Sequence, residues 1–290
     1  MNRLMLLRRR HGLTGPDEAG PTPLLKRTPT MTQTSVSQAE IIRHQVTRVR
    51  HETRRRTLTI ATIEALGTDM RRIGFTTPEL HDFVSASFDD HIKLFFPDST
   101  GQMVMRDFTP RRFDTTANTL TIDFALHDSG PATQWAAAAK VGDTLDIGGP
   151  RGSAVVPDDF DWYVLIGDES ALPAIGRRVE ELRAGVPAIT LGVVDGADDE
   201  QTFVTDAAWT GHWVHRNETS ATDAELLVGA LQNLTLPAGE GFVWIAAETA
   251  VAKTLRAHVL DTLGHRREWT KAAGYWTRGL SDASDKSLGS

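Results

Sequence analysis

The chain of 290 residues contains no cysteine. That absence excludes disulfide bonds, thiolate-ligated iron–sulfur clusters, cysteine nucleophiles and thiolate zinc sites. Any redox chemistry would therefore depend on a bound organic cofactor. The sequence also lacks an apolar run approaching the roughly 18 residues that a membrane helix needs, so we expect no membrane-spanning segment and a cytoplasmic location.

The chain has fewer basic than acidic residues. The chain has 31 Lys and Arg against 38 Asp and Glu, a net charge of -7, which argues against nonspecific binding of nucleic acid. Enough cations remain for a local basic pocket. His212 and His215 have no recognisable third ligand, so the sequence indicates no metal site. The nucleophile elbow of hydrolases is also missing.

The first 37 residues differ in kind from the rest. They mix three consecutive arginines, Arg8–Arg10, with Gly, Pro and Thr, and they show no periodicity. The charges follow a short apolar stretch instead of preceding it, so a signal peptide is not expected. We predict that residues 1–37 are a disordered tail or an over-long start, with Met31 as an alternative initiator.

Short alternating segments fill residues 38–156. Leu120, Ile122 and Phe124 share one face of an expected strand, and residues 92–96 repeat the alternation. Alternation with a period of two is typical of half-buried antiparallel strands. Because Gly, Asp and Pro turns join these segments, we predict an antiparallel β-barrel.

Continuous apolar runs alternate with helical patterns in residues 161–280. Buried strands are expected at 162–166, 188–194 and 242–247, and helical faces at 172–182 and 251–263. Thr222 begins a capping-box pattern, and Thr249 is the expected cap of the last helix. Strands that alternate with helices predict a parallel, nucleotide-binding type of α/β sheet. Residues 157–159 are expected to be a linker, and 281–290 a flexible C-terminus.

Residues 106–113 place a cation, a ring and a hydroxyl at the end of an expected strand. Arg106 would bind a phosphate through paired hydrogen bonds, and Phe108 would flank a planar heterocycle. Pro110 would bend the chain outward and expose backbone groups. This chemistry suits a flavin; the alternative is a basic strand end that leads into a surface turn.

Two further segments have ligand-binding chemistry. A Gly-Pro turn at 130–131 precedes a helix expected to begin near Thr133, whose free N–H groups would receive a pyrophosphate; the alternative is a surface helix with Trp135 in the core. Asp168 and Glu169 follow a strand at the sheet edge where ligands bind. Their carboxylates would accept from ribose or adenine, or would only complement a helix start. No G-x-G-x-x-G fingerprint is present.

Six ordered motifs make the chain similar to the siderophore-interacting protein family, flavin-dependent ferric-siderophore reductases related to the ferredoxin reductase superfamily. The motifs are R-x-F-T-P-R-x-F-D at 106–114, D-F-x-L-H at 123–127, G-P-A-x-x-W-A at 130–136, G-P-R-G-S at 149–153, G-D-E-S-A-L-P-A-I at 167–175 and G-Y-W-x-R-G at 274–279. The similarity covers essentially everything after about residue 40.

The resemblance implies an FAD-binding β-barrel at 38–156 followed by an NAD(P)H-binding α/β domain at 161–280. The residues that it implies for FAD are Arg106, Phe108, Thr109, Asp123, Phe124, His127, Thr133, Trp135 and Ala136, with Asp168 and Glu169 on the nucleotide side. Lys93 and Arg278 would receive an anionic ferric siderophore. Family members often have Arg at the Thr277 position, so Arg278 stands one residue late. Otherwise Lys93 would be a solvated strand lysine, and Tyr275 and Trp276 would pack between domains.

The implied function is reduction of Fe(III)-siderophore to Fe(II) for intracellular iron release, with NADH or NADPH as the donor and FAD as the cofactor. No indispensable acid or base is expected, because the flavin supplies the chemistry. Alternatives are a general NAD(P)H:flavin oxidoreductase with another acceptor, a non-catalytic flavin- or siderophore-binding module, and an external ferredoxin donor. Arg177, Arg178 and Arg216 are candidates for the 2′-phosphate of NADPH or are surface arginines. The siderophore and the oligomeric state are not indicated.

Overall fold

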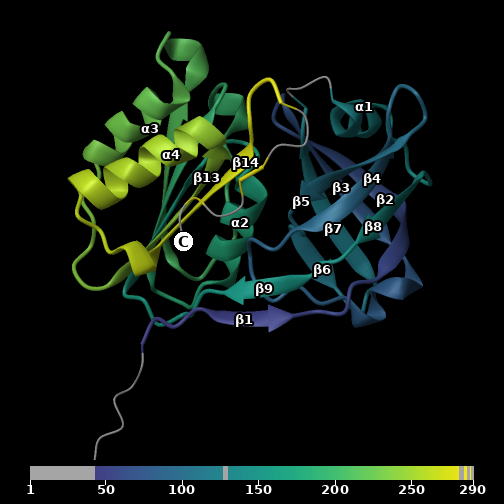
Figure 1. Cartoon of the computed structure of the whole chain (residues 1–290), viewed down its shortest axis with the longest axis horizontal. Helices are drawn as coiled ribbons and strands as arrows, with labels where there is room; N and C mark the ends of the chain where they lie inside the picture. The colour runs from purple at the N-terminus through teal and green to yellow at the C-terminus, as the bar shows by residue number, and fades with distance from the viewer. Residues whose placement is uncertain (1–42, 127–129, 281–283, 286–287, 289–290) are drawn as a thin grey trace, which may run out of the picture. The chain divides into compact units, whose positions relative to one another are not determined.

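The computed structural model describes residues 43–126, 130–280, 284–285 and 288. The tail expected at 1–37 and the candidate His127 lie outside these residues. The described strands form a seven-stranded antiparallel sheet, a five-stranded parallel sheet and a two-stranded antiparallel ribbon (Figure 1).

The antiparallel sheet has the strand order β5-β4-β8-β2-β3-β7-β6. Its strands are β2 (Arg55–Leu66), β3 (Met70–Thr76), β4 (Ile92–Pro97), β5 (Met103–Phe108), β6 (Arg112–Asp114), β7 (Thr119–Ala125) and β8 (Thr144–Gly148). β5 and β6 are the two edges of this order, yet only residues 109–111 join them. Such a connection spans roughly 10–14 Å, so the sheet curls until its edges lie close together. The predicted antiparallel barrel is confirmed.

The alternation read from the sequence places the barrel core correctly. Leu94, Phe96, Leu120 and Ile122 are completely buried, and Phe124 is nearly so. Period-two alternation allows one face of each strand to be removed from water, which is the main source of stabilisation of such a sheet. A 3₁₀ helix (Pro78–Asp82) and helix α1 (Pro131–Ala138) accompany the barrel strands, and β1 (Thr47–Arg50) pairs with β9 (Gly152–Val155).

The parallel sheet has the order β12-β11-β10-β13-β14. Its strands are β10 (Trp162–Gly167), β11 (Pro187–Val194), β12 (Ala208–His215), β13 (Gly241–Glu248) and β14 (Thr270–Trp276). Every residue of β10 and β13 is buried, as expected for strands covered on both faces. Helices α3 (Asp223–Gln232) and α4 (Thr249–Ala257) cover one face and α2 (Leu172–Glu181) the other (Figure 1). The predicted parallel α/β half is confirmed.

One helix cap was predicted correctly and one was not. Thr222 begins α3 with a complete capping box, in which its hydroxyl accepts from the Glu225 N–H at 3.3 Å. The prediction that Thr249 caps α4 is wrong. The Glu248 carboxylate accepts from the Ala250 N–H at 2.6 Å, and the Thr249 hydroxyl instead donates to the Trp276 carbonyl at 2.9 Å. A carboxylate one residue earlier thus satisfies the free N–H groups of the first turn.

The segment expected to be a linker is tightly held. Phe160 is 1% exposed, the Tyr163 hydroxyl donates to the Pro157 carbonyl at 2.9 Å, and Arg183 Nη2 donates to the Phe160 carbonyl at 2.7 Å. Residues 156–161 therefore pack against the elements that they connect. The domain limits at 156 and 161 remain a prediction.

Two of the arginines considered for a 2′-phosphate are buried on α2. Arg177 Nη1 donates to Ser85 Oγ at 2.7 Å and to the Pro110 carbonyl at 3.1 Å. The Arg178 guanidinium lies 4.7 Å from the ring centre of Tyr163. Both of the interpretations considered for these two residues, phosphate ligands and surface arginines, are wrong, because the two side chains are enclosed between α2 and neighbouring segments.

Glu180, also on α2, binds the segment between β5 and β6. Arg111 donates two hydrogen bonds to its carboxylate, at 2.7 and 2.6 Å, and Arg112 adds a third at 3.0 Å. Burial alone would raise the pKa of Glu180, but the bonds and charge of Arg111 outweigh it and hold the pKa below its usual value. The two arginines differ sharply in exposure: the Arg111 side chain is 3% exposed and the Arg112 side chain 65%.

That difference in exposure predicts a difference in stability. Arg111→Ala should lower the free energy of unfolding by about 3 kcal/mol, because it leaves a partly buried carboxylate without its main partner. Arg112→Ala, which removes an exposed partner of the same carboxylate, should cost at most about 1 kcal/mol. Urea unfolding of both variants measures the two losses. Equal losses would show that burial does not decide the strength of these pairs.

Candidate functional site

The motifs expected to bind a flavin meet on one side of the barrel. The Phe108 ring at the end of β5 lies 4.7 Å from that of Phe124 on β7, and the Trp135 ring of α1 lies 5.8 Å from Phe124. Three segments far apart in sequence are therefore joined by aromatic contacts. Phe108 and Trp135 are half-buried, whereas Phe124 and Ala136 are buried in the core. The side chains of Phe124 and Ala136 pack in the barrel core, so a ligand would contact these two residues through their backbone groups.

The start of α1 has the chemistry of a phosphate site. The helix begins at Pro131, two residues before the expected position, and its N-cap Gly130 makes no side-chain capping bond. Thr133 lies in the first turn, where its hydroxyl donates to the Ala125 carbonyl at 3.4 Å. Free N–H groups and the positive end of the helix dipole favour an anion.

Arg106 and Thr109 differ in accessibility. Arg106 is partly exposed on β5, where Nη1 donates to the Met105 carbonyl at 2.8 Å, while Thr109 is 6% exposed. The carbonyl of Pro110, expected to be presented to a ligand, instead accepts from Arg177. Arg106 and Arg112 are the accessible arginines of this segment, and Arg112 already binds Glu180. Arg106 is therefore the candidate for a phosphate.

Asp123 is committed to a partner within the barrel. Arg72 Nε and Nη2 each donate to one carboxylate oxygen of Asp123 at 2.7 Å, and the Asp123 side chain is fully buried. The hydrogen bonds that Arg72 donates to Asp123 raise the pKa of Arg72. This bidentate pair orients β3 and β7, so Asp123 supports the barrel through its side chain.

Asp168 organises the carboxyl edge of the parallel sheet. One of its oxygens accepts from the backbone N–H of Glu248 and from Trp276 Nε1, both at 2.9 Å. The other accepts from the Ser170 N–H at 3.0 Å. Since Asp168 is only 1% exposed, its carboxylate ties together the ends of β10, β13 and β14. Gly167 before it is required by space, because an added Cβ would lie 2.3 Å from Ala171 Cβ.

Glu169 does not face solvent either. Its carboxylate binds the guanidinium of Arg216, which follows β12. Burial is the main reason that the pKa of Glu169 is raised, and the hydrogen bond from Arg216 acts in the opposite direction. Arg216, one of the arginines considered for a 2′-phosphate, therefore lies in an ion-pair network at the carboxyl edge of the parallel sheet.

A cavity of about 790 Å³ opens beside the barrel. Its walls combine β4, β5, the turn after β8, the segment at 89–91 and the start of β14. The cationic side chains that line it are Arg54, Arg55, Lys93, Arg151 and Lys271, and the carboxylates are Asp89, Asp90 and Asp107. His91 also contributes, so the cavity has an excess of two positive charges without counting the histidine.

Of the two residues expected to receive a siderophore, only Lys93 lines this cavity. Its Nζ lies 2.9 Å from Asp107 Oδ1. The guanidinium of Arg278 instead lies 5.8 Å from the Trp276 ring centre. The backbone N–H of Arg278 donates to Glu248 Oε1 at 3.2 Å. Lys271, seven residues earlier, supplies the cation from the C-terminal strand.

Arg151 and Lys271 are the residues that sequence reasoning missed. Arg151 lies in the Gly-Pro-Arg-Gly-Ser motif, which was recognised without a role, and it makes no ion pair within the described part of the chain. Lys271 is the second residue of the strand that ends in the Gly-Tyr-Trp motif, and its Nζ lies 2.5 Å from Asp89 Oδ2. The sequence signal that could have identified these two residues was a cation within the first motif and a cation just before the second.

Asp89 positions Lys271 from the barrel side. Its carboxylate also accepts from Trp244 Nε1 of β13 at 3.0 Å and from Ser87 Oγ at 2.9 Å. Burial would raise the pKa of Asp89, but the charge and hydrogen bond of Lys271 outweigh it and the pKa is lowered. This contact brings a residue of the parallel sheet to the wall of a cavity built mainly by the barrel.

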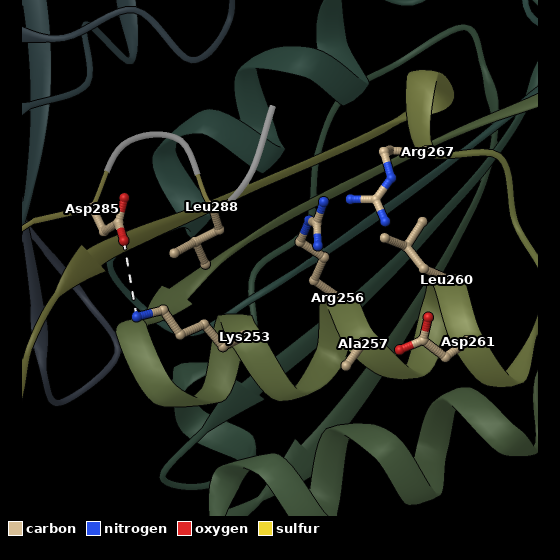
Figure 2. Close-up of a pocket in the computed structure, with 8 residues that line it drawn as sticks. All are labelled: Lys253, Arg256, Ala257, Leu260, Asp261, Arg267, Asp285 and Leu288. Atoms are coloured by element: carbon tan, nitrogen blue, oxygen red, sulfur yellow. Dashed lines mark ion pairs between the residues drawn. The ribbon is translucent and has the colours of Figure 1, made fainter.

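A smaller cavity of about 320 Å³ lies along α4 and the C-terminal segment (Figure 2). Lys253 Nζ and Asp285 Oδ2 approach to 3.9 Å across it. Its lining residues include none of the motif residues.

His215, considered for a metal, binds Glu200 at 2.9 Å, and no group of three potential ligands occurs among the described residues. None of the described helices is long and apolar enough to cross a membrane.

Family models match both halves of the chain. Residues 160–279 match the siderophore-interacting protein model, and residues 59–104 and 98–154 match the siderophore-interacting FAD-binding domain. The "NADPH-dependent ferric-chelate reductase" of Escherichia coli is 34% identical over 79% of this chain and 95% of its own length. The "Ferric vibriobactin reductase ViuB" of Vibrio cholerae is 26% identical over 74% of this chain and 86% of its own.

A solved structure shares the fold. The siderophore utilization protein of T. fusca has 34% identity and a TM-score of 0.76, over 82% of this chain and 98% of its own. The antiparallel barrel, the parallel sheet and the match to an FAD-binding domain define the class as a two-domain flavoprotein. Within that class, the chain belongs to the siderophore-interacting protein family. An uncapped helix start, an accessible guanidinium and a half-buried ring fit FAD, the cofactor of that domain.

The pKa of Asp89 predicts how stability depends on pH. A carboxylate whose pKa is lowered by folding stabilises the folded state above its usual value of 3.8 and loses that contribution as the pH falls below it. Asp89→Asn should therefore be less stable than the wild type by about 3 kcal/mol at pH 7, and the gap should narrow below the usual aspartate value. Urea unfolding at pH 7 and pH 3 measures both gaps; a gap independent of pH would contradict this role.

Proposed function

We propose that this protein reduces Fe(III) held in an anionic siderophore, with NAD(P)H as the electron donor. The cationic cavity is the observation that supports the substrate most directly, since five basic side chains surround a space of about 790 Å³. The relatives named as ferric-chelate and ferric vibriobactin reductases have the same reaction class. NAD(P)H is a cytoplasmic metabolite, so we place the reaction and the release of iron in the cytoplasm.

The chemistry that FAD would supply when bound is the conversion of a two-electron hydride donation into single-electron transfers to iron. The chain's own contribution is to bind and to position. Arg106 and the start of α1 would hold the phosphates, while Phe108 and Thr109 would border the ring system. No side chain need transfer a proton for iron to be reduced. Fe(II) is held less well than Fe(III) by hard oxygen ligands, so reduction promotes release.

The charges of the cavity would select the chelate. Lys93 and Lys271 are each fixed by a carboxylate, Asp107 and Asp89, which limits the conformations of two flexible side chains. Arg151 makes no such pair with any described residue and is exposed. It can therefore approach an anionic ligand without first breaking an ion pair, so we assign it the main attraction.

The overall proposal is tested by anaerobic turnover with a panel of ferric siderophores and a trap for Fe(II). Loss of flavin colour on adding NADH or NADPH, its return on adding a chelate, and Fe(II) in the trap are the expected results. Colour loss without return for every chelate would indicate another acceptor. Absence of colour loss with both nucleotides would contradict the proposed donor.

Arg151→Ala should raise the KM for a ferric tricatecholate about tenfold, because an accessible charge is removed from the approach path. The KM for an uncharged ferric trihydroxamate should change little. Added salt should weaken the wild-type interaction more than that of the variant. Lys140→Ala, an exposed lysine outside the cavity, is the matched control. Equal effects on the charged and uncharged chelates would contradict electrostatic selection.

Arg106→Ala should be purified with little or no flavin, since the variant lacks the guanidinium assigned to a phosphate. The ratio of flavin to protein absorbance measures the loss. Arg112→Ala removes an exposed arginine six residues away and should remain fully yellow. An Arg106→Ala protein as yellow as the wild type would overturn the assignment.

A further inference from the structure

The order of the parallel strands locates the nucleotide independently of any motif. In the order β12-β11-β10-β13-β14, the chain runs outward in one direction from β10 and then resumes on its other side with β13. Ligands of such sheets bind at this reversal, beyond the carboxyl ends of the strands. Asp195 directly follows β11, the second strand. An acidic residue after the second strand of a nucleotide-binding sheet is placed to accept from ribose hydroxyls.

Arg216 is the basic side chain that the sequence analysis considered for this edge, and three carboxylates bind it. Nη1 donates to Asp195 Oδ1 at 2.9 Å, and Nε and Nη2 donate to Asp223 at 2.9 and 3.0 Å. Nη2 also donates to Glu169 Oε2 at 2.9 Å. Every nitrogen of the guanidinium is therefore used. Burial would lower the pKa of Arg216, but these carboxylates outweigh it and raise the pKa.

Arg216 cannot leave this network without a large cost. The Glu169 side chain is only 5% exposed, and Asp168 lies next to it in the chain. If Arg216 turned to a 2′-phosphate, Glu169 would remain as a buried charge without its partner, a strongly unfavourable state. Arg216 is thus the counter-ion of Glu169 and is not available as a phosphate ligand.

The remaining charge at this edge is negative. Glu169, Asp195 and Asp223 outnumber Arg216, which leaves two net negative charges. Asp195 is the accessible member, with 42% of its side chain exposed. A ribose diol can donate hydrogen bonds to its carboxylate, whereas a 2′-phosphate, with nearly two negative charges of its own, would be repelled.

We infer that this protein uses NADH in preference to NADPH and that Asp195 determines the preference. The inference rests on the proposed donor class and narrows it. It separates this chain from the relative named for NADPH. Arg216 acts indirectly as a positioning residue, because it holds Asp195 and Asp223 at the edge of the sheet.

The test measures anaerobic flavin reduction by each nucleotide, without any iron chelate. The rate constant divided by the half-saturating concentration should favour NADH at least about tenfold. Asp195→Asn removes one negative charge and should reduce that ratio to about threefold or less. The control Asp206→Asn makes the same change before the start of β12, at the opposite end of the strand from Arg216, and should keep the wild-type ratio. A wild type that uses NADPH as well as NADH, or an Asp195→Asn ratio equal to the wild type's, would overturn the inference.

Calorimetric titration of the FAD-loaded protein with 5′-AMP and with 2′,5′-ADP separates this inference from the proposed function. Tighter binding of 5′-AMP is expected, and Asp195→Asn should narrow the difference. If neither nucleotide reduces the flavin but 5′-AMP still binds more tightly, the proposed donor is wrong. The preference of this sheet edge for a nucleotide without a 2′-phosphate is then still supported. Equal or tighter binding of 2′,5′-ADP, or no binding of either, would overturn the specificity of the edge.

Discussion

Buried charge on helix α2 holds the barrel against the parallel sheet, and the candidate site depends on that contact. Arg177 binds Ser85 and the Pro110 carbonyl, and Glu180 binds Arg111. These groups are costly to separate, because each would remain desolvated without its partner. Since the bonds reach the segments at 85 and 110, they fix two loops that flank the flavin motifs. A site assembled from both sheets requires such a fixed contact.

The cavity extends the same arrangement. Asp89 belongs to the barrel side, yet its carboxylate accepts a hydrogen bond from Trp244 of β13 and forms an ion pair with Lys271 of β14. A lysine side chain in solution samples many rotamers, and fixing it costs conformational entropy. Here a buried carboxylate holds the ammonium group in place before any chelate arrives, so binding need not fix it again. The cost is a reduced net charge, and Arg151, which also lines the cavity, adds a positive charge.

The sequence predicted the two halves of the fold well, because each depends on local periodicity. The barrel strands at 92–96 and 120–125 and the buried strands at 162–166 and 242–247 follow from the spacing of apolar residues alone. The site was predicted less completely. Lys93 was identified and lines the cavity, but Arg151 and Lys271 are 120 residues apart and meet only through tertiary packing. In sequence, Asp168 resembles a ligand-binding carboxylate. The neighbouring residues do not show that groups at the ends of β13 and β14 donate hydrogen bonds to its oxygens.

The two ends of β14 have opposite electrostatic character, and this bears on the proposed function, which requires two anionic substrates. Lys271 stands at the second position of the strand beside the cationic cavity, and Trp276 ends the strand at the acidic carboxyl edge of the parallel sheet. At about 3.3 Å per residue, these positions are roughly 16 Å apart. Such a distance exceeds the screening length of about 8 Å in physiological salt, so each end presents its own field to solvent. Under the proposed function, the acidic end would accommodate a dinucleotide without a 2′-phosphate, and the basic end would attract a highly charged chelate. Opposed charge along a single strand would thus keep the proposed donor and the proposed acceptor at separate places.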